Sequence, residues 1–328
     1  MGKRNAIILA AGLSSRFVPL SYEIPKGLLV VKGEVLIERQ IRQLNEANIT
    51  DITVVVGYKA EMFDYLSEKF GATIVLNEDF SKYNNSSSLF RVLDKLGNTF
   101  ICSSDNYFSN NVFIEYSDYS YYSSKYAVGE TKEYCIVTAH DGSILNVNIG
   151  GRDSWYMVGH AYFNEEFSRT FAEIMKEEFK SDKTKKEYWE DVYIRNIGNL
   201  PKMEIKHYQP TDIVEFDSLE ELRNFDEKYV NNTGSEILRS ICNALDCEEQ
   251  DILNIENIEG QYCSRCFYFR CGRTGGEYLY TDVSNDRNLV NKTNFIALKN
   301  NTITLKKIYT HPTENWDVSL LIRKKANL

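Results

Sequence analysis

The stretch Ala6-Ile7-Ile8-Leu9-Ala10-Ala11-Gly12-Leu13-Ser14-Ser15-Arg16-Phe17 decides the fold class of this chain. Its apolar run 6–10, closely followed by glycine, is typical of a strand buried on both faces of a parallel sheet. The small residues after it let backbone N–H groups approach a phosphate chain, and Arg16 and Lys26 add positive charge. We therefore predict an anion-binding loop; the alternative is an ordinary strand-to-helix turn with two solvated cations.

Strands and helices alternate along the rest of the first half of the chain, according to the hydrophobic periodicity. This order implies right-handed βαβ crossovers and a three-layer α/β/α, Rossmann-like sheet, in which ligands bind at the carboxyl ends of the strands. Loops that follow residues 9, 76 and 102 should therefore converge. The predicted strands cover 6–10, 52–58, 73–76 and 99–103, and the predicted helices cover 36–44, 60–70 and 87–96.

A second group of elements completes the first domain. Tyr and Gly become frequent over residues 121–163, which predicts an antiparallel extension of shorter strands over the site. Residues 165–180 and 187–197 have helical spacing, and 214–218 reads as a last strand that enters a helix with Asp217 or Ser218 as N-cap. The polar stretch 231–235 is typical of a linker. We therefore predict two domains, residues 1–232 and 233–328.

The charge of the chain excludes several classes of function. A net charge of −9 argues against nonspecific nucleic-acid binding, because affinity for phosphate backbones needs a basic surface. No apolar run reaches membrane-spanning length, and the short N-terminal run leads into a loop rather than a cleavage site. We expect a cytoplasmic protein that meets anionic ligands through a few local cations and a metal.

Several motifs together resemble the nucleotidyltransferase family, in particular its bacterial CTP:phosphocholine cytidylyltransferase branch. The resemblance covers residues 5 to about 230 and is far more specific than any single motif. It rests on the loop 9–17 with Pro25-Lys26-Gly27, and on Tyr83-Asn84-Asn85-Ser86-Ser87-Ser88-Leu89, Ser104-Asp105-Asn106-Tyr107, Tyr188-Trp189-Glu190-Asp191 and Val214-Glu215-Phe216-Asp217-Ser218.

This resemblance implies a nucleotide site for CTP with Mg²⁺ as cofactor. Lys26, Arg16 and Asp105 are the implied catalytic residues. Asp105 would bind the metal together with Asp191, our first choice, or Glu190, since Mg²⁺ prefers carboxylate and phosphate oxygens. The alternative for Asp105 is a turn-forming role before Asn106. The expected nucleotide-binding residues are Leu9, Ala10, Ala11, Gly12, Arg16, Lys26, Asn84, Asn85, Ser88 and Ser104.

The acceptor should be a small phosphorylated amino alcohol, with phosphocholine first. A quaternary ammonium has no hydrogen-bond donors and binds best to ring faces. The candidate rings are Tyr134, Trp189, Trp155 and Tyr162, with Glu133 or Glu190 adding negative charge. Asn84, Asn85 and Ser88 could hold the cytosine edges, or they could belong to a loop whose neighbours Ser86 and Ser87 cap a helix.

Besides the leading assignment to phosphocholine, two alternatives remain open for the function. The same chemistry could act on 2-aminoethylphosphonate, phosphoethanolamine or a sugar phosphate. A primary ammonium would favour carboxylates over rings, and sugar hydroxyls would favour Asn, Gln and Glu. A protein of another class would bind nucleotide without catalysis, although Arg16, Lys26, Asp105 and Asp191 speak against it. A homodimer is compatible with all three.

The second domain resembles the N-terminal lobe of bacterial choline kinases, only in part. The resemblance rests on residues 237–242 and 251–256, on Gly260 and on 267–269. Cys263-Ser264-Arg265 stands where such kinases have a nucleotide loop, Tyr280-Thr281 stands where a basic residue is expected, and the lobe with the catalytic Asp is absent. We therefore expect a small α+β domain, with no kinase activity, that serves packing or dimerisation.

Overall fold

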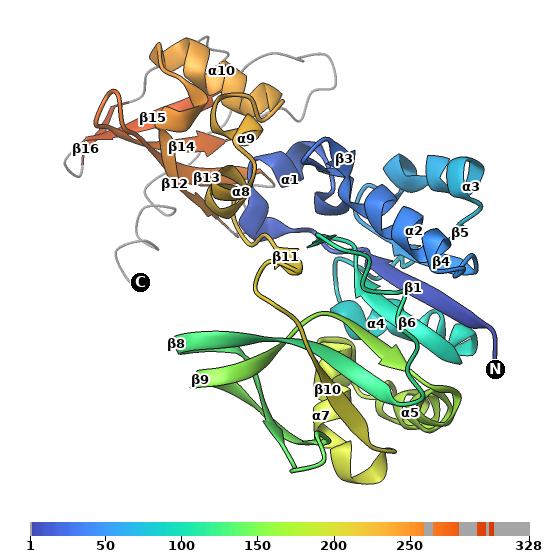
Figure 1. Cartoon of the computed structure of the whole chain (residues 1–328). Helices are drawn as coiled ribbons and strands as arrows, with labels where there is room; N and C mark the ends of the chain where they lie inside the picture. Colours follow the sequence, from blue (N-terminus) through green and yellow to red (C-terminus); the bar gives the residue numbers. More distant parts are fainter. Residues whose placement is uncertain (1, 259–264, 282–293, 300–301, 305–328) are drawn as a thin grey trace. The chain divides into compact units, whose positions relative to one another are not determined.

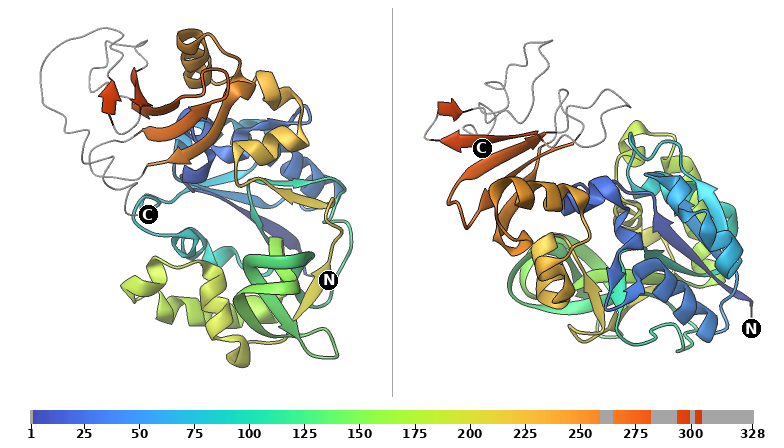
Figure 2. Two further views of the ribbon diagram at one scale, coloured as in Figure 1. Left: turned by 90° about the vertical axis from the view of Figure 1, so that its left-hand side faces the viewer. Right: turned by 90° about the horizontal axis from the view of Figure 1, so that it is seen from above.

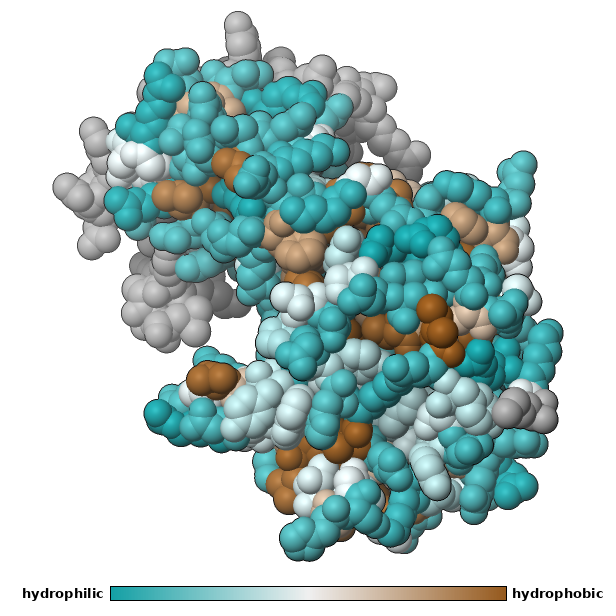
Figure 3. Space-filling view, in the orientation of Figure 1, coloured by the Kyte–Doolittle hydropathy of each residue, from teal (hydrophilic) through white to brown (hydrophobic). Residues whose placement is uncertain are grey.

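The computed structural model describes residues 2–258, 265–281, 294–299 and 302–304. The chain divides into two compact units, Met1–Thr233 and Gly234–Leu328. Hydrophilic side chains cover most of the face shown in Figure 3, and apolar side chains gather only in small patches. Within the described ranges, no helix combines the length and apolar character needed to cross a bilayer.

The first unit is built on a seven-stranded, mainly parallel sheet with the order β10-β8-β9-β6-β1-β4-β5. Parallel pairs join β1 to β4 and β6, β4 to β5, and β10 to β8, whereas β9 runs antiparallel to β6 and β8. The strands are β1 (Arg4–Ala10), β4 (Ile52–Val56), β5 (Thr73–Leu76), β6 (Asn98–Ser103), β8 (Ser120–Thr138), β9 (Ile144–Phe163) and β10 (Met203–His207).

Helices cover both faces of this sheet, as the views in Figures 1 and 2 show. The side chains of β1 divide between two cores: Ala6, Ile8 and Ala10 belong to one, and Ile7 belongs to the other. The predicted three-layer α/β/α arrangement is therefore confirmed. One face carries α2 (Leu36–Glu46) and α3 (Tyr65–Phe70), and the other carries α4 (Asn85–Phe90), α5 (Glu165–Glu178) and α7 (Trp189–Arg195).

Residues 121–163 differ from the expectation of short strands. They form β8 and β9, of 19 and 20 residues, paired as one long antiparallel hairpin. The glycines that suggested breaks are absorbed inside the strands: Gly129 and Gly150 have positive φ, and register shifts lie beside both. A bulge of this kind bends a strand without ending it, which sequence periodicity does not show.

Short elements complete the first unit. Two small antiparallel pairs join β2 (Val30–Val31) to β3 (Glu34–Val35) and β7 (Asn106–Phe108) to β11 (Ile213–Glu215). Ser218 caps α8 (Leu219–Phe225), because its hydroxyl accepts the Glu221 N–H. The other elements are η1 (Ser15–Phe17), α1 (Leu20–Glu23), η2 (Lys26–Leu28), η3 (Ala60–Phe63), η4 (Leu93–Lys95), α6 (Asp182–Lys185), η5 (Ile197–Asn199) and α9 (Lys228–Asn231).

The second unit contains an antiparallel sheet with the order β12-β13-β14-β15-β16. Its elements are α10 (Glu236–Leu245), η6 (Glu249–Asp251), β12 (Ile252–Asn257), β13 (Cys266–Cys271), β14 (Glu277–Thr281), β15 (Asn294–Lys299) and β16 (Thr302–Thr304). Gly260, Cys263 and Ser264 lie outside the described residues. The likeness to a kinase lobe stays a prediction.

Candidate functional site

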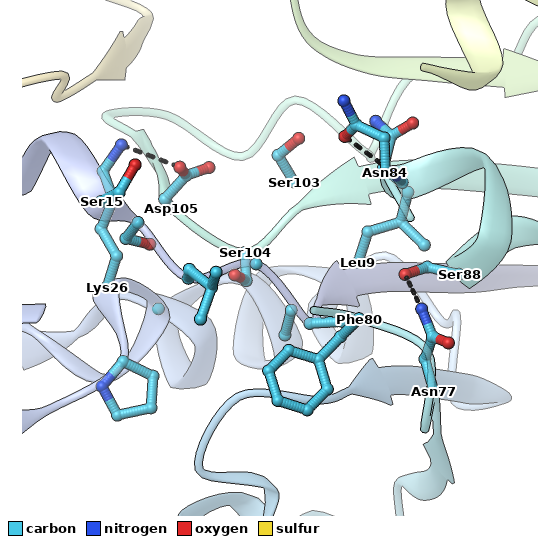
Figure 4. A pocket seen from close by; sticks show the side chains of 18 of the residues that line it. Leu9, Ser15, Lys26, Asn77, Phe80, Asn84, Ser88, Ser103, Ser104 and Asp105 are labelled. Atoms are coloured by element: carbon cyan, nitrogen blue, oxygen red, sulfur yellow. Dashed lines mark hydrogen bonds and ion pairs between the residues drawn. The ribbon is translucent and has the colours of Figure 1, made fainter. Parts of the chain in front are cut away.

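A cavity of about 610 Å³ lies at the carboxyl ends of β1 and β6 and is lined by the loops that follow β1, β5 and β6 (Figure 4). Its lining includes all ten residues predicted to bind nucleotide, namely Leu9, Ala10, Ala11, Gly12, Arg16, Lys26, Asn84, Asn85, Ser88 and Ser104. Asp105 lines it as well. The structure thus brings together loops that are far apart in the sequence, and the roles of their residues stay predictions.

The loop after β1 presents its backbone to this cavity. Ala10 and Ala11 are buried, while a Cβ added to Gly12 would meet no atom within 4 Å. Backbone N–H groups that face open space in this way can be approached closely by an anion. Arg16, in η1, is exposed at the rim, and its guanidinium lies 2.9 Å from the carboxylate of Asp217.

Lys26 and Asp105 form the most buried ion pair of the cavity. Lys26 Nζ lies 2.8 Å from Asp105 Oδ2, and the two side chains are 8% and 22% exposed. Gly27 allows this approach, since a Cβ there would lie 2.8 Å from Ser104 Oγ. Burial alone would lower the pKa of Lys26, but the charge and hydrogen bond of Asp105, with Glu215 and Asp217, raise it, so the ammonium stays charged.

Glu215 and Asp217 bring two further carboxylates to the cavity, which the sequence did not single out as metal ligands. Glu215 is the last residue of β11, and its side chain is exposed to the cavity. The protein around the cavity still removes much of the water from its carboxylate. This burial, followed by the charge of Asp105, raises its pKa to about 7. The signal in the sequence was the acidic segment 214–218, which we assigned to a strand and a helix cap and counted among the family motifs, without a metal role.

These carboxylates suit a divalent cation that also binds substrate. Asp105 Oδ1 is buried and has no hydrogen-bond partner in the protein, although Oδ2 pairs with Lys26. In the part of the chain that the structure describes, no three His, Cys, Asp or Glu side chains converge closely enough to hold a metal alone. A cation beside Asp105 would therefore need substrate phosphate oxygens, as Mg²⁺ commonly uses.

The metal role that we predicted for Asp191 and Glu190 stays a prediction, and both carboxylates have hydrogen-bond partners around the start of α7. Asp191 Oδ2 accepts the Tyr188 N–H at 2.9 Å, which completes a capping box, and Oδ1 accepts the Tyr134 hydroxyl at 3.2 Å. Glu190 accepts Asn85 Nδ2 at 3.3 Å and the Tyr122 hydroxyl at 3.1 Å. Acids in the first turn of a helix satisfy its unpaired N–H groups, and sequence alone does not distinguish this from ligation.

Asn77 and Phe80 line the wall where the nucleobase was expected, and the sequence did not single them out. Asn77 Nδ2 donates to Ser88 Oγ at 3.0 Å (Figure 4). Phe80 fits because residue 57 is glycine: a Cβ there would lie 2.6 Å from Phe80 Cβ. Gly57, which directly follows β4, was the feature of the sequence that could have indicated a close neighbour at this wall.

Asn84 and Asn85 also have structural duties on this wall. Asn84 caps α4, with its Oδ1 accepting the Asn85 N–H at 2.8 Å. Asn85 Oδ1 accepts the Trp189 N–H at 2.8 Å, and its Nδ2 donates to Glu190. Asn85 thus ties α4 to α7, and its amide is largely committed. Asn84 Nδ2 and the Ser88 hydroxyl hydrogen remain as donors toward the cavity.

Three of the four predicted acceptor rings are engaged in packing, and their role toward the acceptor stays a prediction. Trp189 and Tyr162 are each 2% exposed and lie in the two cores, where Trp189 stacks on Tyr122. The half-buried Trp155 stacks on His207 with ring centroids 3.9 Å apart. These rings pack against other side chains, which is the commonest use of aromatic residues. Tyr134 remains half-buried, held by Asp191.

Of the predicted acceptor groups, Glu133 does not line the cavity, whereas several residues that we did not predict do. The exposed Glu133 has its pKa raised by partial burial and then by the charge of Asp217, while Arg16 and Lys125 oppose this shift. Tyr188, 44% exposed, lines the cavity although we did not predict it. Ser103, Lys82, Tyr83 and Lys186 also line the cavity and were not predicted.

Comparisons with known proteins agree with this geometry. The MobA-like NTP transferase domain family matches residues 6–128. The 2-aminoethylphosphonate cytidylyltransferase of Lancefieldella rimae is 35% identical over 232 residues, 70% of this chain and 94% of that protein. The choline-phosphate cytidylyltransferase of Streptococcus pneumoniae is 32% identical over 223 residues, 68% and 97% of the two chains. The chain belongs to the cytidylyltransferase family of nucleotidyltransferases.

A solved structure extends this family assignment to three dimensions. The CTP:phosphocholine cytidylyltransferase of Streptococcus pneumoniae aligns with a TM-score of 0.66 and 32% identity, covering 69% of this chain and 99% of that one. The matches to these relatives extend over about the length of the first unit, Met1–Thr233, and the cavity lies in that unit. The protein is an enzyme, and the alternative of a catalytically silent nucleotide binder is set aside.

Proposed function

We propose that this enzyme transfers the cytidylyl group of CTP to a phosphonate or phosphate oxygen of a small acceptor that carries a primary amine. The observation that carries the proposal is a single cavity that combines an open backbone loop and the Lys26–Asp105 pair with further carboxylates. Such a cavity can receive a polyphosphate at one part and a cationic head group at another.

On the CTP side, the chain's own groups bind and screen the triphosphate. Backbone N–H groups of the loop after β1 and the side chains of Arg16 and Lys26 are placed to receive its oxygens. Negative charge moves onto the departing pyrophosphate during transfer, so a fixed, buried cation such as Lys26 stabilises the transition state more than the ground state. No general base is needed, because the acceptor oxygen is already ionised.

Mg²⁺ is the proposed cofactor. Asp105, through its unpartnered Oδ1, and Glu215 or Asp217 would hold it together with substrate phosphates. When bound, the ion neutralises charge between the two anionic reactants. Release of Asp217 from Arg16 and of Asp105 from Lys26 would leave both cations available to the phosphates.

The nucleobase wall suits cytosine. Cytosine presents acceptors at O2 and N3, whereas uracil presents an N3–H donor. The donors left unengaged on the wall, Asn84 Nδ2 and the Ser88 hydroxyl hydrogen, can serve acceptors of this kind. We assign CTP as the donor substrate on this basis, in agreement with the names of the relatives.

The acceptor assignment rests on which charged groups and rings are still available. Trp189, Tyr162 and Trp155 are engaged in packing, so a closed aromatic cage is missing from the described part of the first unit. Glu215 and Asp217 line the cavity, and Glu133, whose pKa Asp217 influences, is exposed. These carboxylates can accept N–H bonds, which a primary ammonium offers and a trimethylammonium group does not. An acceptor of the 2-aminoethylphosphonate kind fits best.

Phosphocholine is the second candidate, favoured by a different observation. The Tyr134 hydroxyl donates to Asp191 Oδ1 and the Tyr188 backbone N–H donates to Asp191 Oδ2, while the Tyr188 side chain is 44% exposed and lines the cavity. Two rings with an adjacent acid could hold a trimethylammonium group. The relative from Streptococcus pneumoniae acts on choline phosphate by its name.

A grid of reactions tests the proposal. Pyrophosphate release is measured with CTP, UTP, ATP and GTP against 2-aminoethylphosphonate, phosphoethanolamine, phosphocholine and glucose 1-phosphate, with and without Mg²⁺. We expect turnover only with CTP, Mg²⁺ and an amine-bearing acceptor. Preference for the sugar phosphate, or for another nucleotide, would overturn the proposal.

A further inference from the structure

We propose that Lys186 binds the phosphonate or phosphate group of the acceptor. This inference rests on the proposed function and adds to it the residue that holds the attacking group. The resemblance to known families assigns no role to this position. Lys186 belongs to the site because its side chain lines the cavity.

Lys186 differs from the lysines beside it in having no ionic partner. Lys183 pairs with Glu187 at 3.6 Å, and Lys185 pairs with Asp182 at 2.9 Å while lying over the Tyr83 ring. Neither of these two lines the cavity, whereas Lys186 does. Across the described ranges, Lys186 makes no ion pair with any carboxylate. A lysine ammonium of this kind is a compact charge with three donors, suited to phosphate oxygens.

The segment that carries Lys186 is held firmly at both ends. The Asn84 N–H donates to the Lys185 carbonyl at 3.0 Å, and the buried Ser86 hydroxyl donates to the Thr184 carbonyl at 2.8 Å. Beyond Lys186, the Tyr188 N–H donates to Asp191 at 2.9 Å. The backbone of residue 186 is therefore placed by polar contacts to α4 and α7, which limits where its side chain can reach.

The other cations of the cavity are already compensated or committed. Of the four that line it, Arg16 pairs with Asp217, Lys26 pairs with Asp105, and Lys82 lies 3.9 Å from Asp79. Arg16 and Lys26 adjoin the loop that receives the triphosphate. An additional cation that lines the cavity and makes no ion pair within the described ranges points, in a chain of net charge −9, to a second anionic group.

Lys186 lies in the chain between the residue that Asn84 of the nucleobase wall contacts and Tyr188 of the acceptor side, away from Lys26, which suits the acceptor as the source of that group. Figure 4 shows Lys26 and Asp105 at one side of the cavity and Asn84 at the other. Lys186 follows the carbonyl that Asn84 contacts, so its backbone belongs to the side away from Lys26. In-line displacement puts the attacking oxygen and the leaving pyrophosphate on opposite sides of the α-phosphorus, so a cation opposite Lys26 suits the attacking group.

The test compares Lys186→Ala with Lys185→Ala as matched control and Lys186→Arg as rescue. The acceptor KM is measured at saturating CTP, and the CTP dissociation constant is measured by calorimetry without acceptor. We expect Lys186→Ala to raise the acceptor KM about tenfold, the loss of one charge-assisted hydrogen bond, with CTP affinity unchanged. Lys186→Arg should recover most of the loss, and Lys185→Ala should have no effect.

Two results would overturn the inference. One is a loss confined to CTP binding, which would make Lys186 a nucleotide contact. The other is equal behaviour of Lys186→Ala and Lys185→Ala, which would leave only a solvated lysine. Failure of the wild-type enzyme with every acceptor would contradict the proposed function instead; calorimetric binding of 2-aminoethylphosphonate to the enzyme with CTP then gives the same comparison for Lys186.

Discussion

The two sides of the cavity differ in how their residues are made available to substrate. On the side of β1 and β6, small residues and glycine leave backbone and cations open, and every residue expected there lines the cavity. On the side of α6 and α7, the expected groups Trp189, Glu190 and Asp191 are used to pack and cap a helix. The comparison teaches that a binding motif made of backbone is easier to recognise than one made of aromatic and acidic side chains.

The largest effect is expected from Asp105, the carboxylate that pairs with Lys26 in the cavity. Asp105→Asn should lower turnover about a thousandfold and abolish activation by Mg²⁺, because an amide is a poor ligand for a hard cation. Asp191→Asn is the matched control and should keep its Mg²⁺ activation. A Mg²⁺ titration of both variants, with circular dichroism to check folding, decides the point. Loss of Mg²⁺ activation in Asp191→Asn alone would make Asp191 rather than Asp105 the metal ligand.

Trp189→Ala should act on stability rather than on substrate choice. Its ring lies between Tyr122, Phe163 and Phe171, and removing it should cost about 3 to 4 kcal/mol of unfolding free energy. Urea unfolding measures this loss. Tyr188→Ala removes an exposed ring and is the control; it should change the unfolding free energy by less than about 1 kcal/mol, because surface substitutions typically change it by roughly 0.5 kcal/mol in either direction. A Trp189→Ala variant with wild-type stability and a raised acceptor KM would contradict the assignment of Trp189 to the core.

Lys26→Ala sharpens the other side of the comparison. Loss of this buried cation should lower kcat roughly a hundredfold while changing the CTP KM little, since its charge matters most as charge builds on the leaving group. Steady-state kinetics at saturating acceptor give both constants, and Lys26→Arg shows how much charge alone restores. Turnover near wild type in Lys26→Ala would remove the residue from the mechanism.

Glu190→Gln gives the smallest and most specific effect, on the pH dependence of stability. Burial raises the pKa of Glu190 to about 7, against 4.5 ordinarily. Between these values the folded protein holds a proton that the unfolded chain has released, so this residue's contribution to stability falls as pH rises from 4.5 through 7. Gln does not titrate, so the variant should gain stability relative to wild type between pH 5 and pH 8.

Urea unfolding at both pH values, with the exposed Glu173→Gln as control, measures this difference. An equal pH dependence in wild type and Glu190→Gln would mean that Glu190 is ionised in the folded protein throughout.

Local pattern was sufficient where one segment carries the whole signal. The apolar run 6–10 and the helical spacing of 36–44 predicted β1 and α2, because burial on both faces or on one stripe follows directly from residue order. The long hairpin of β8 and β9 was mistaken for shorter strands, since bulges at glycine look like strand ends in a sequence.

Two groups of acidic residues show why sequence alone does not assign the metal ligands. Glu190 and Asp191 have the composition of a metal site, but a helix N-terminus also attracts acids, and only the position of its N–H groups decides between them. Glu215 and Asp217 were passed over because the pairing of β11 with β7, which joins residues about a hundred positions apart, is what brings them to Asp105.

A competition between two acceptors tests the central claim most directly. The enzyme is given CTP, Mg²⁺ and equal concentrations of 2-aminoethylphosphonate and phosphocholine in one reaction, and ³¹P NMR follows the two cytidylyl products, whose phosphorus signals differ. The account predicts that the phosphonate product forms first and in excess, because carboxylates rather than a closed set of rings meet the amine. Dominant formation of the choline product would contradict it.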